Sequence, residues 1–136
     1  MNFHTDVLKI SLPLIFLFGC ELLHANPYSD CAQLASELNK NTPIIMDKST
    51  TTKSVSCIEK NSHLALVFVH EIALAKRYIN IDGLQSMKPT VLKMWCTQYK
   101  RREFIDYVDV IMDYYDGKGA FLTEIKLTGV DCKQFD

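Results

Sequence analysis

Residues 106–128 (DYVDVIMDYYDGKGAFLTEIKLT) carry the clearest fold signal in the chain. Side chains alternate in two sets from Tyr107 to Tyr115, which is the pattern of a β-strand whose neighbours point to opposite faces. Asp116–Gly119 (DGKG) has the composition of a tight hairpin turn. The next stretch alternates again, and four of its side chains share one side: Phe121, Thr123, Ile125 and Leu127. The segment therefore predicts two antiparallel strands joined by a short turn.

Two further strands are predicted upstream of this hairpin. His63–Ala75 (HLALVFVHEIALA) is apolar on both faces, which suits a central strand covered on both sides. Lys53–Glu59 alternates like a strand, and Lys60–Ser62 between the two has turn composition. These two strands are therefore expected to form a second hairpin. Pro43–Met46 is a short apolar plug without an assigned element.

Helical spacing of apolar residues occurs in two segments. Asn26–Asn41 is predicted to form a short amphipathic helix, with Ser29 or Asp30 as its cap. A second helical run covers residues 82–95, and Pro89 either kinks it or begins another helix. The element order is then α-β-β-α-β-β. This order predicts an α+β fold with a four-stranded, mostly antiparallel sheet packed with helices.

Composition limits the classes of function. The chain has 136 residues, of which 48% are hydrophobic, so it can bury the core of one domain and is not expected to be disordered. The formal net charge of −1 argues against nucleic acid as a partner, because no excess of positive charge is available to neutralise phosphates.

The N-terminal residues have the features of an export signal. Ile10–Gly19 (ISLPLIFLFG) is an apolar run about half as long as the ~20 residues that a membrane-spanning helix requires. A run of this length is typical of a signal peptide. We therefore expect residues 1–25 to be a signal peptide and residues 26–136 to form a single exported α+β domain in the periplasm.

A lipoprotein signal is the alternative for the same leader. Leu17–Cys20 (LFGC) resembles a bacterial lipobox, in which the cysteine is lipidated and becomes the first mature residue. Residues 1–19 would then be the part removed. Lipid on Cys20 would be the protein's means of attachment to a membrane, and would place it at the outer membrane.

Four cysteines remain in the mature domain: Cys31, Cys57, Cys96 and Cys132. They allow three pairings, and disulfides are expected in an oxidising compartment. The chain has no Cys-x-x-Cys motif and no Cys/His cluster, so neither a metal ion nor another cofactor is expected. One hypothesis joins Cys96 to Cys132, which would clamp the C-terminal tail to the second helix, and joins Cys31 to Cys57.

The sequence offers no catalytic constellation. His63 and His70 lie seven residues apart on one predicted strand, so they are expected on opposite faces. Asp109 and Asp113 would have backbones about 13 Å apart at ~3.3 Å per residue, which exceeds the separation of paired catalytic carboxylates. A solvated sheet face is the simpler interpretation of the two aspartates. We therefore expect no catalytic residue and a protein that is not an enzyme.

An aromatic surface is the most suggestive feature. Tyr107, Ile111 and Tyr115 fall on one face of a predicted strand, and Trp95 lies at the end of the second helix. These four residues are the candidate partner-binding residues, because an amphipathic face of this kind can accept a helix or strand of another protein. Lys100–Arg102, in a charged turn of helix or loop, could meet lipid head groups or an acidic partner, although an exposed loop also explains it.

The layout of motifs resembles a known family. The C-terminal half has Lys88–Thr90 in a helix, Trp95–Thr97 at its end, Arg102 and Phe104 in a connector, Val108–Tyr115 in a strand, Gly117–Gly119 in a turn and a final Cys132. With Pro43–Asp47 and Val55 in the N-terminal half, the chain resembles a family of small exported bacterial proteins of uncharacterised function. The same layout is similar to the alternative pilotins of type II secretion systems, which are outer-membrane lipoproteins that bind a secretin's C-terminal segment and guide its assembly.

The resemblance implies a protein that binds another protein. In that family the cysteines that match Cys96 and Cys132 form a disulfide, and no catalytic residue carries over. A pilotin-like protein would bind an amphipathic segment of an outer-membrane secretin in a groove between sheet and helix. Two alternatives remain at this stage: a periplasmic inhibitor or immunity protein, and a small hydrolase that uses His70 or Asp113.

Overall fold

The computed structural model describes residues 27–136. The expected signal peptide, the cleavage site and Cys20 lie outside the described residues and stay predictions. No helix of the described part is long and apolar enough to cross a membrane.

The described chain forms a mixed five-stranded sheet in the order β1-β2-β3-β4-β5. The strands are β1 (Ile44–Ile45), β2 (Thr50–Lys60), β3 (His63–Ile72), β4 (Val108–Asp116) and β5 (Phe121–Leu127). The prediction of four strands therefore missed one: the apolar plug supplies β1, which pairs with Thr51 and Thr52 of β2. Two residues are too few to show a periodic pattern of their own.

The sheet is antiparallel except at its centre, where β3 and β4 run parallel. Between them the chain passes through η1 (Lys76–Tyr78), α3 (Ile81–Gln85), α4 (Lys88–Thr97) and α5 (Tyr99–Ile105). Parallel neighbours need such a crossover, because a tight turn can only reverse the chain. Pro89 lies in the first turn of α4 and so begins a new helix, as one of the two sequence alternatives had it.

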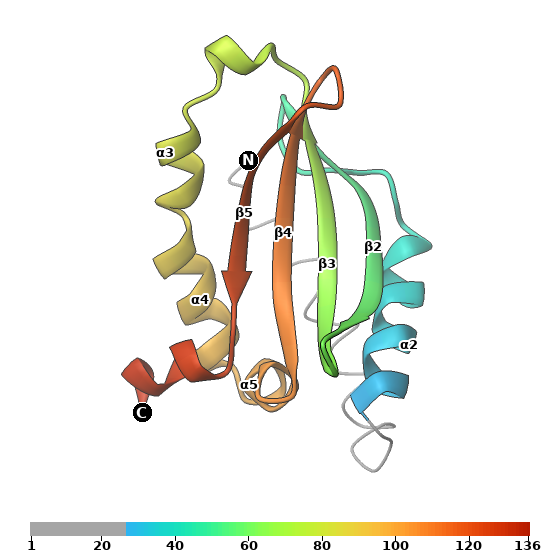
Figure 1. The fold of residues 1–136 in the computed structure, drawn as a ribbon, viewed down its shortest axis with the longest axis vertical. Helices are drawn as coiled ribbons and strands as arrows, with labels where there is room; N and C mark the ends of the chain where they lie inside the picture. The colour runs from blue at the N-terminus through green and yellow to red at the C-terminus, as the bar shows by residue number, and fades with distance from the viewer. Residues whose placement is uncertain (1–26) are drawn as a thin grey trace.

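All the long helices pack on one face of the sheet. Helix α2 (Pro27–Asn39) lies beside β2, and α3 and α4 lie beside β5 (Figure 1). Ser29 and Asp30 lie inside α2, so neither is the residue before its first turn. One core joins both helical groups to the same side of the sheet, and its fully buried members include Leu34, Leu38, Val55, Leu66, Val110, Ile125 and Leu127.

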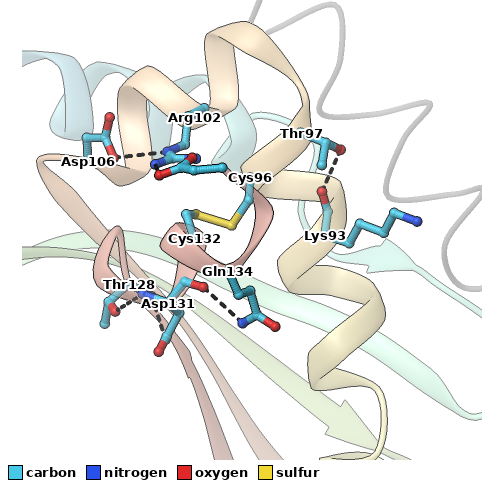
Figure 2. Close-up of a disulfide and its surroundings, with 10 residues drawn as sticks. Lys93, Cys96, Thr97, Arg102, Asp106, Thr128, Asp131, Cys132 and Gln134 are labelled. Atoms are coloured by element: carbon cyan, nitrogen blue, oxygen red, sulfur yellow. Dashed lines mark hydrogen bonds and ion pairs between the residues drawn. A yellow bond between two sulfur atoms is a disulfide. The ribbon is translucent and has the colours of Figure 1, made fainter.

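Two disulfides connect the helices to the rest of the domain. Cys31 of α2 is joined to Cys57 of β2, with their Cα atoms 5.6 Å apart. Cys96 of α4 is joined to Cys132 of the C-terminal 3-10 helix η2 (Val130–Phe135), with their Cα atoms 5.2 Å apart (Figure 2). The second disulfide therefore holds the C-terminal tail against α4.

The two hairpin turns have different backbone chemistry. Asn61 and Ser62 join β2 to β3 and both adopt positive φ, at 54° and 64°, which is the conformation of a type I′ turn. In the β4–β5 turn, Asp116 accepts hydrogen bonds from the N–H groups of Lys118 and Ala120, and Gly119 has φ of 83°. The predicted turn at Asp116–Gly119 is therefore confirmed.

Candidate functional site

The side of the sheet away from the helices is the candidate functional site, and we call it the open face. No helix of the described residues covers it. The strand registers place these side chains there: Ser54, Ser56, Ile58, Ala65, Val67, Val69, Glu71, Asp109, Ile111, Asp113, Tyr115, Phe121, Glu124 and Lys126. In the described part of the chain, helices cover one of the two sides of β3 that were expected to be covered, and on the other side Ala65 and Val67 are also buried.

Ile111, Tyr115 and Phe121 give the open face its large apolar groups. Ile111 and Tyr115 are partly buried, and Phe121 is 50% exposed. The rings of Tyr115 and Phe121 meet edge to face, with centroids 5.6 Å apart. The sequence predicts Ile111 and Tyr115 as binding residues. The same alternation groups Phe121 with Thr123, Ile125 and Leu127 on one side of the last strand.

A register shift explains the position of Phe121. The pairing of β4 with β5 shifts between Tyr114 and Tyr115, so that Tyr114 lies opposite Thr123 and Tyr115 lies opposite Phe121. Leu122 is the extra residue of this irregularity, and it is buried. Phe121 therefore lies beside Tyr115 on the open face. Of the four side chains predicted to share one side of β5, only Thr123, Ile125 and Leu127 lie on the core side.

The structure separates the other two predicted binding residues from this group. Trp95 is 4% exposed and its ring packs against Phe104, with centroids 6.0 Å apart, so it belongs to the core on the opposite side of the sheet. The helical period places Trp95 on the buried side of α4. Tyr107 precedes β4 and is 67% exposed, so it is available at one end of the sheet.

One end of the open face holds an ion-pair cluster. Asp109 is buried, and its carboxylate lies 3.0 Å from Nε2 of His63 and 3.7 Å from Nζ of Lys126. Side chains from β3 and β5 thus contact the one carboxylate from β4. This corrects the expectation of a solvated aspartate at position 109.

The middle of the open face holds two carboxylates on adjacent strands. Asp113 of β4 lies directly opposite Glu124 of β5. The pKa of Asp113 is raised to about 6, mainly by partial burial and then by the hydrogen bond and the negative charge of Glu124. Like charges directly opposite each other destabilise a sheet, so this pair is costly unless something supplies positive charge.

Side chains block parts of both edges of the sheet. The amide of Asn39, at the end of α2, accepts from the N–H of Val55 and donates to its C=O. At the other edge, Nε2 of Gln85 donates to the C=O of Glu124 at 2.9 Å. These contacts use backbone groups that an added strand would need, so the open face is better suited to a partner than either edge.

His70 belongs to the core and not to the open face. Its Nδ1 lies 2.9 Å from the hydroxyl of Thr52, and its ring centroid lies 4.9 Å from that of Tyr114. Burial lowers the pKa of His70 to about 4, so the imidazole is neutral at pH 7. The opposite orientation of His63 and His70 is confirmed, and Asp113 lies across the sheet from His70, so these two residues do not form one catalytic site.

The predicted basic cluster is not a cluster in the structure. Arg101 is buried, with its guanidinium 5.7 Å from the centre of the Trp95 ring. Arg102 forms an ion pair with Asp106 at 3.2 Å (Figure 2). It forms a second ion pair with Asp136 at 2.8 Å. Lys100 is partly buried, and its Nζ lies 5.2 Å from the centre of the Tyr99 ring. In residues 27–136 no three His, Cys, Asp or Glu side chains gather as metal ligands.

The comparisons with known proteins identify the fold. No protein-family model matches the sequence, and no curated protein matches it. Among solved structures, a protein from Pseudomonas aeruginosa assigned as secreted superposes with a TM-score of 0.61 at 11% identity, over 78% of this chain and 92% of that one.

Two pilotins of type II secretion systems share the fold. EpsS from Vibrio vulnificus has a TM-score of 0.57 at 13% identity, over 78% of this chain and 91% of its own. AspS from Vibrio cholerae has a TM-score of 0.54 at 14% identity, over 84% of this chain and 99% of its own. The resemblance inferred from the sequence motifs therefore extends to the three-dimensional fold.

Proposed function

We propose that this protein is an envelope accessory of a bacterial secretion system that binds an amphipathic segment of a secretin subunit on its open face. The observation that carries the proposal is the combination of a pilotin fold with a sheet face that no described helix covers. A partner helix or strand could bury the apolar groups of that face, and burial of apolar area is the main driving force of such association.

The core of the domain limits where a segment can bind. The space between sheet and helices is filled by buried side chains from both helical groups, among them Leu34, Trp95 and Ile125. The open face instead presents Ile111, Tyr115 and Phe121 to a partner. We therefore place the binding site on the open face and not in a groove between sheet and helix.

The membrane attachment of the protein forms a separate part of the proposal. A pilotin-like role requires the protein to be attached to the outer membrane, and lipid on Cys20 would attach it there. Replacement of Cys20 by Ser should then move the protein from the membrane fraction to the soluble periplasmic fraction. Unchanged fractionation of the variant would contradict the lipid anchor. It would leave the proposal about the binding site unaffected.

The binding proposal is tested with an Ile111→Glu variant. A buried charge at the centre of the contact should abolish capture of the secretin from solubilised envelopes and reduce the amount of assembled secretin multimer in cells. Tyr99→Glu is the matched control, because Tyr99 is 68% exposed on α5, away from the open face. Circular dichroism must show that both variants are folded. If Ile111→Glu captures the secretin as well as the wild type, the proposed site is wrong.

A further inference from the structure

Charge is unevenly distributed over the open face. At one end, Asp109 is paired with Lys126 and its carboxylate contacts Nε2 of His63. Beyond it lie three acidic residues, Glu71, Asp113 and Glu124, and no ion pair within 4.0 Å involves them in the described part of the chain. This half of the face therefore holds three carboxylates that form no ion pair within the described residues.

The carboxylates of this half are held close together by the sheet. Asp113 has Glu124 as its direct neighbour on β5 and Val69 as its direct neighbour on β3. One carboxylate oxygen of Asp113 is buried without a hydrogen-bond partner among the described residues. A buried acceptor that lacks a partner is costly, so a donor brought by another molecule would be stabilised there.

The titratable groups around Asp113 come from every strand that packs beside it. Glu124 of β5 lies directly opposite it, and Glu71 of β3 lies opposite its strand neighbour Tyr115. Asp109 is on the same face of β4, and Lys126 is on the same face of β5. Lys126 lies opposite Ile111 and its ammonium is paired with Asp109. The positive charge on β5 is thus already used at the other end of the face.

Apolar groups flank the two carboxylates along the strands. On one side of the Asp113–Glu124 pair lies the Tyr115–Phe121 ring pair, and on the other side lies Ile111. A segment that crosses this surface would meet an aromatic pair and a carboxylate pair in succession. Only a segment with both apolar and basic side chains complements the two.

We propose that the segment bound on the open face is a basic amphipathic peptide that places a Lys or Arg side chain between Asp113 and Glu124 and an apolar side chain on Tyr115 and Phe121. This inference rests on the proposed function and specifies the chemistry of its partner. An ammonium or guanidinium group supplies the donors and the charge that this half of the face lacks. A second copy of this face would bring Asp113 and Glu124 against a like surface.

The test is a selection of random 16-residue peptides, displayed on phage, on protein purified from the bacterial envelope. Selected peptides are expected to be enriched in Lys and Arg. Their affinity should fall about tenfold for the Asp113→Asn/Glu124→Gln variant at pH 7.5. Raising the salt concentration should also weaken the wild-type complex. Glu37→Gln/Asp82→Asn is the matched control, because it removes two acidic residues from the helices and should leave affinity unchanged.

Other outcomes would overturn the inference. These are peptides without basic enrichment, affinity that is equal for the wild type and the double variant, binding mapped by amide chemical shifts to the helical side, and a selection that yields no peptide. A dimer in solution that Ile111→Glu dissociates would make a second copy the occupant instead. If Ile111→Glu abolishes secretin capture but Asp113→Asn/Glu124→Gln does not weaken it, the proposed function survives and the charge inference is wrong.

Discussion

His70 and Thr52 form a buried hydrogen-bonded pair, with Nδ1 of the imidazole 2.9 Å from the hydroxyl oxygen, on the helix-covered face of the sheet. The ring also packs beside Tyr114. Burial lowers the pKa of His70 from 6.5 to about 4. The domain therefore folds around a neutral histidine, and this makes its stability depend on pH.

The sign of that dependence follows from proton binding. Above pH 6.5, His70 is neutral in both the folded and the unfolded chain, so it contributes no pH dependence. Between pH 6.5 and 4 the unfolded chain binds a proton that the folded chain excludes, so the free energy of unfolding falls as the pH falls. Relative to His70→Gln, the wild type should lose about 2–3 kcal/mol between pH 7.5 and 4.5. Urea denaturation at the two pH values measures the difference.

The comparison with His70→Gln isolates the histidine, because every other titrating group is shared by the two proteins. The variant is itself expected to be less stable than the wild type at pH 7.5, since it replaces a packed ring. The difference in free energy of unfolding between the wild type and His70→Gln should become smaller as the pH falls. Two curves that stay parallel from pH 7.5 to 4.5 would show that His70 is not held neutral in the fold.

Asp113 gives a pH dependence of the opposite sign. Its pKa is raised to about 6 in the folded chain, mainly by burial and then by Glu124. As the pH rises from about 4 to 6, the unfolded chain releases a proton that the folded chain retains, so the free energy of unfolding falls. Asp113→Asn should therefore be more stable than the wild type at pH 7.5 by about 1 kcal/mol, a value reduced by solvent screening of this partly exposed group. At pH 3.5 this advantage should vanish.

Glu124→Gln provides the check on the Asp113 prediction. Either substitution removes the same like-charge contact, so the gain of the double variant should be smaller than the sum of the two single gains. Thermal or urea denaturation at pH 7.5 measures the change in free energy of unfolding for the two single variants and the double variant. Full additivity would mean that the two carboxylates do not interact.

The disulfide between Cys96 and Cys132 is expected to stabilise the domain by restricting the unfolded chain. The two cysteines are 36 residues apart in the sequence, which corresponds to about 3–4 kcal/mol in the chain-entropy model. Replacement of both by Ser should lower the free energy of unfolding by that amount. Amide hydrogen exchange should increase first in η2. Without the disulfide, the tail is held to α5 by the ion pair between Arg102 and Asp136. Unchanged protection of η2 would contradict this.

Asn39 should protect the edge of β2. Its side-chain amide is bonded to both the N–H and the C=O of Val55, so Asn39→Ala removes two hydrogen bonds and should cost about 2 kcal/mol. It also exposes the two backbone groups to other chains, so light scattering on mild heating should increase. Asn41→Ala, in the loop that follows the helix, is the control, and an equal loss of stability there would contradict the specific role of Asn39.

Local patterns were enough to predict most of the fold. The Asp116–Gly119 turn and the start of a helix at Pro89 depend on a few neighbouring residues, and the sequence shows them directly. The two-residue strand at Ile44 and Ile45 depends on β2 for its definition, so it has no pattern of its own. The sheet is mostly antiparallel, as expected, and the one parallel pairing, of β3 with β4, follows from the helices between them.

The candidate site was harder to predict than the fold. Alternation placed Ile111 and Tyr115 on one face, but an irregularity in the register moved Phe121 to join them. A one-residue shift of this kind reverses the facing of a side chain and leaves no clear mark in the sequence. Trp95 was misplaced for a different reason: aromatic composition alone does not say whether a ring is buried.

The β2–β3 turn offers a stabilising substitution. Asn61 and Ser62 both adopt positive φ, and of the two only Asn is common in that conformation, whereas Gly is the preferred second residue of a type I′ turn. Ser62→Gly should therefore relieve strain and raise the free energy of unfolding by about 0.5–1 kcal/mol. Ser62→Ala is the matched control: it also removes the hydroxyl but keeps a Cβ in the left-handed region, so it should not stabilise. If Ser62→Ala gains as much as Ser62→Gly in urea denaturation, the effect comes from the lost hydroxyl and not from the backbone.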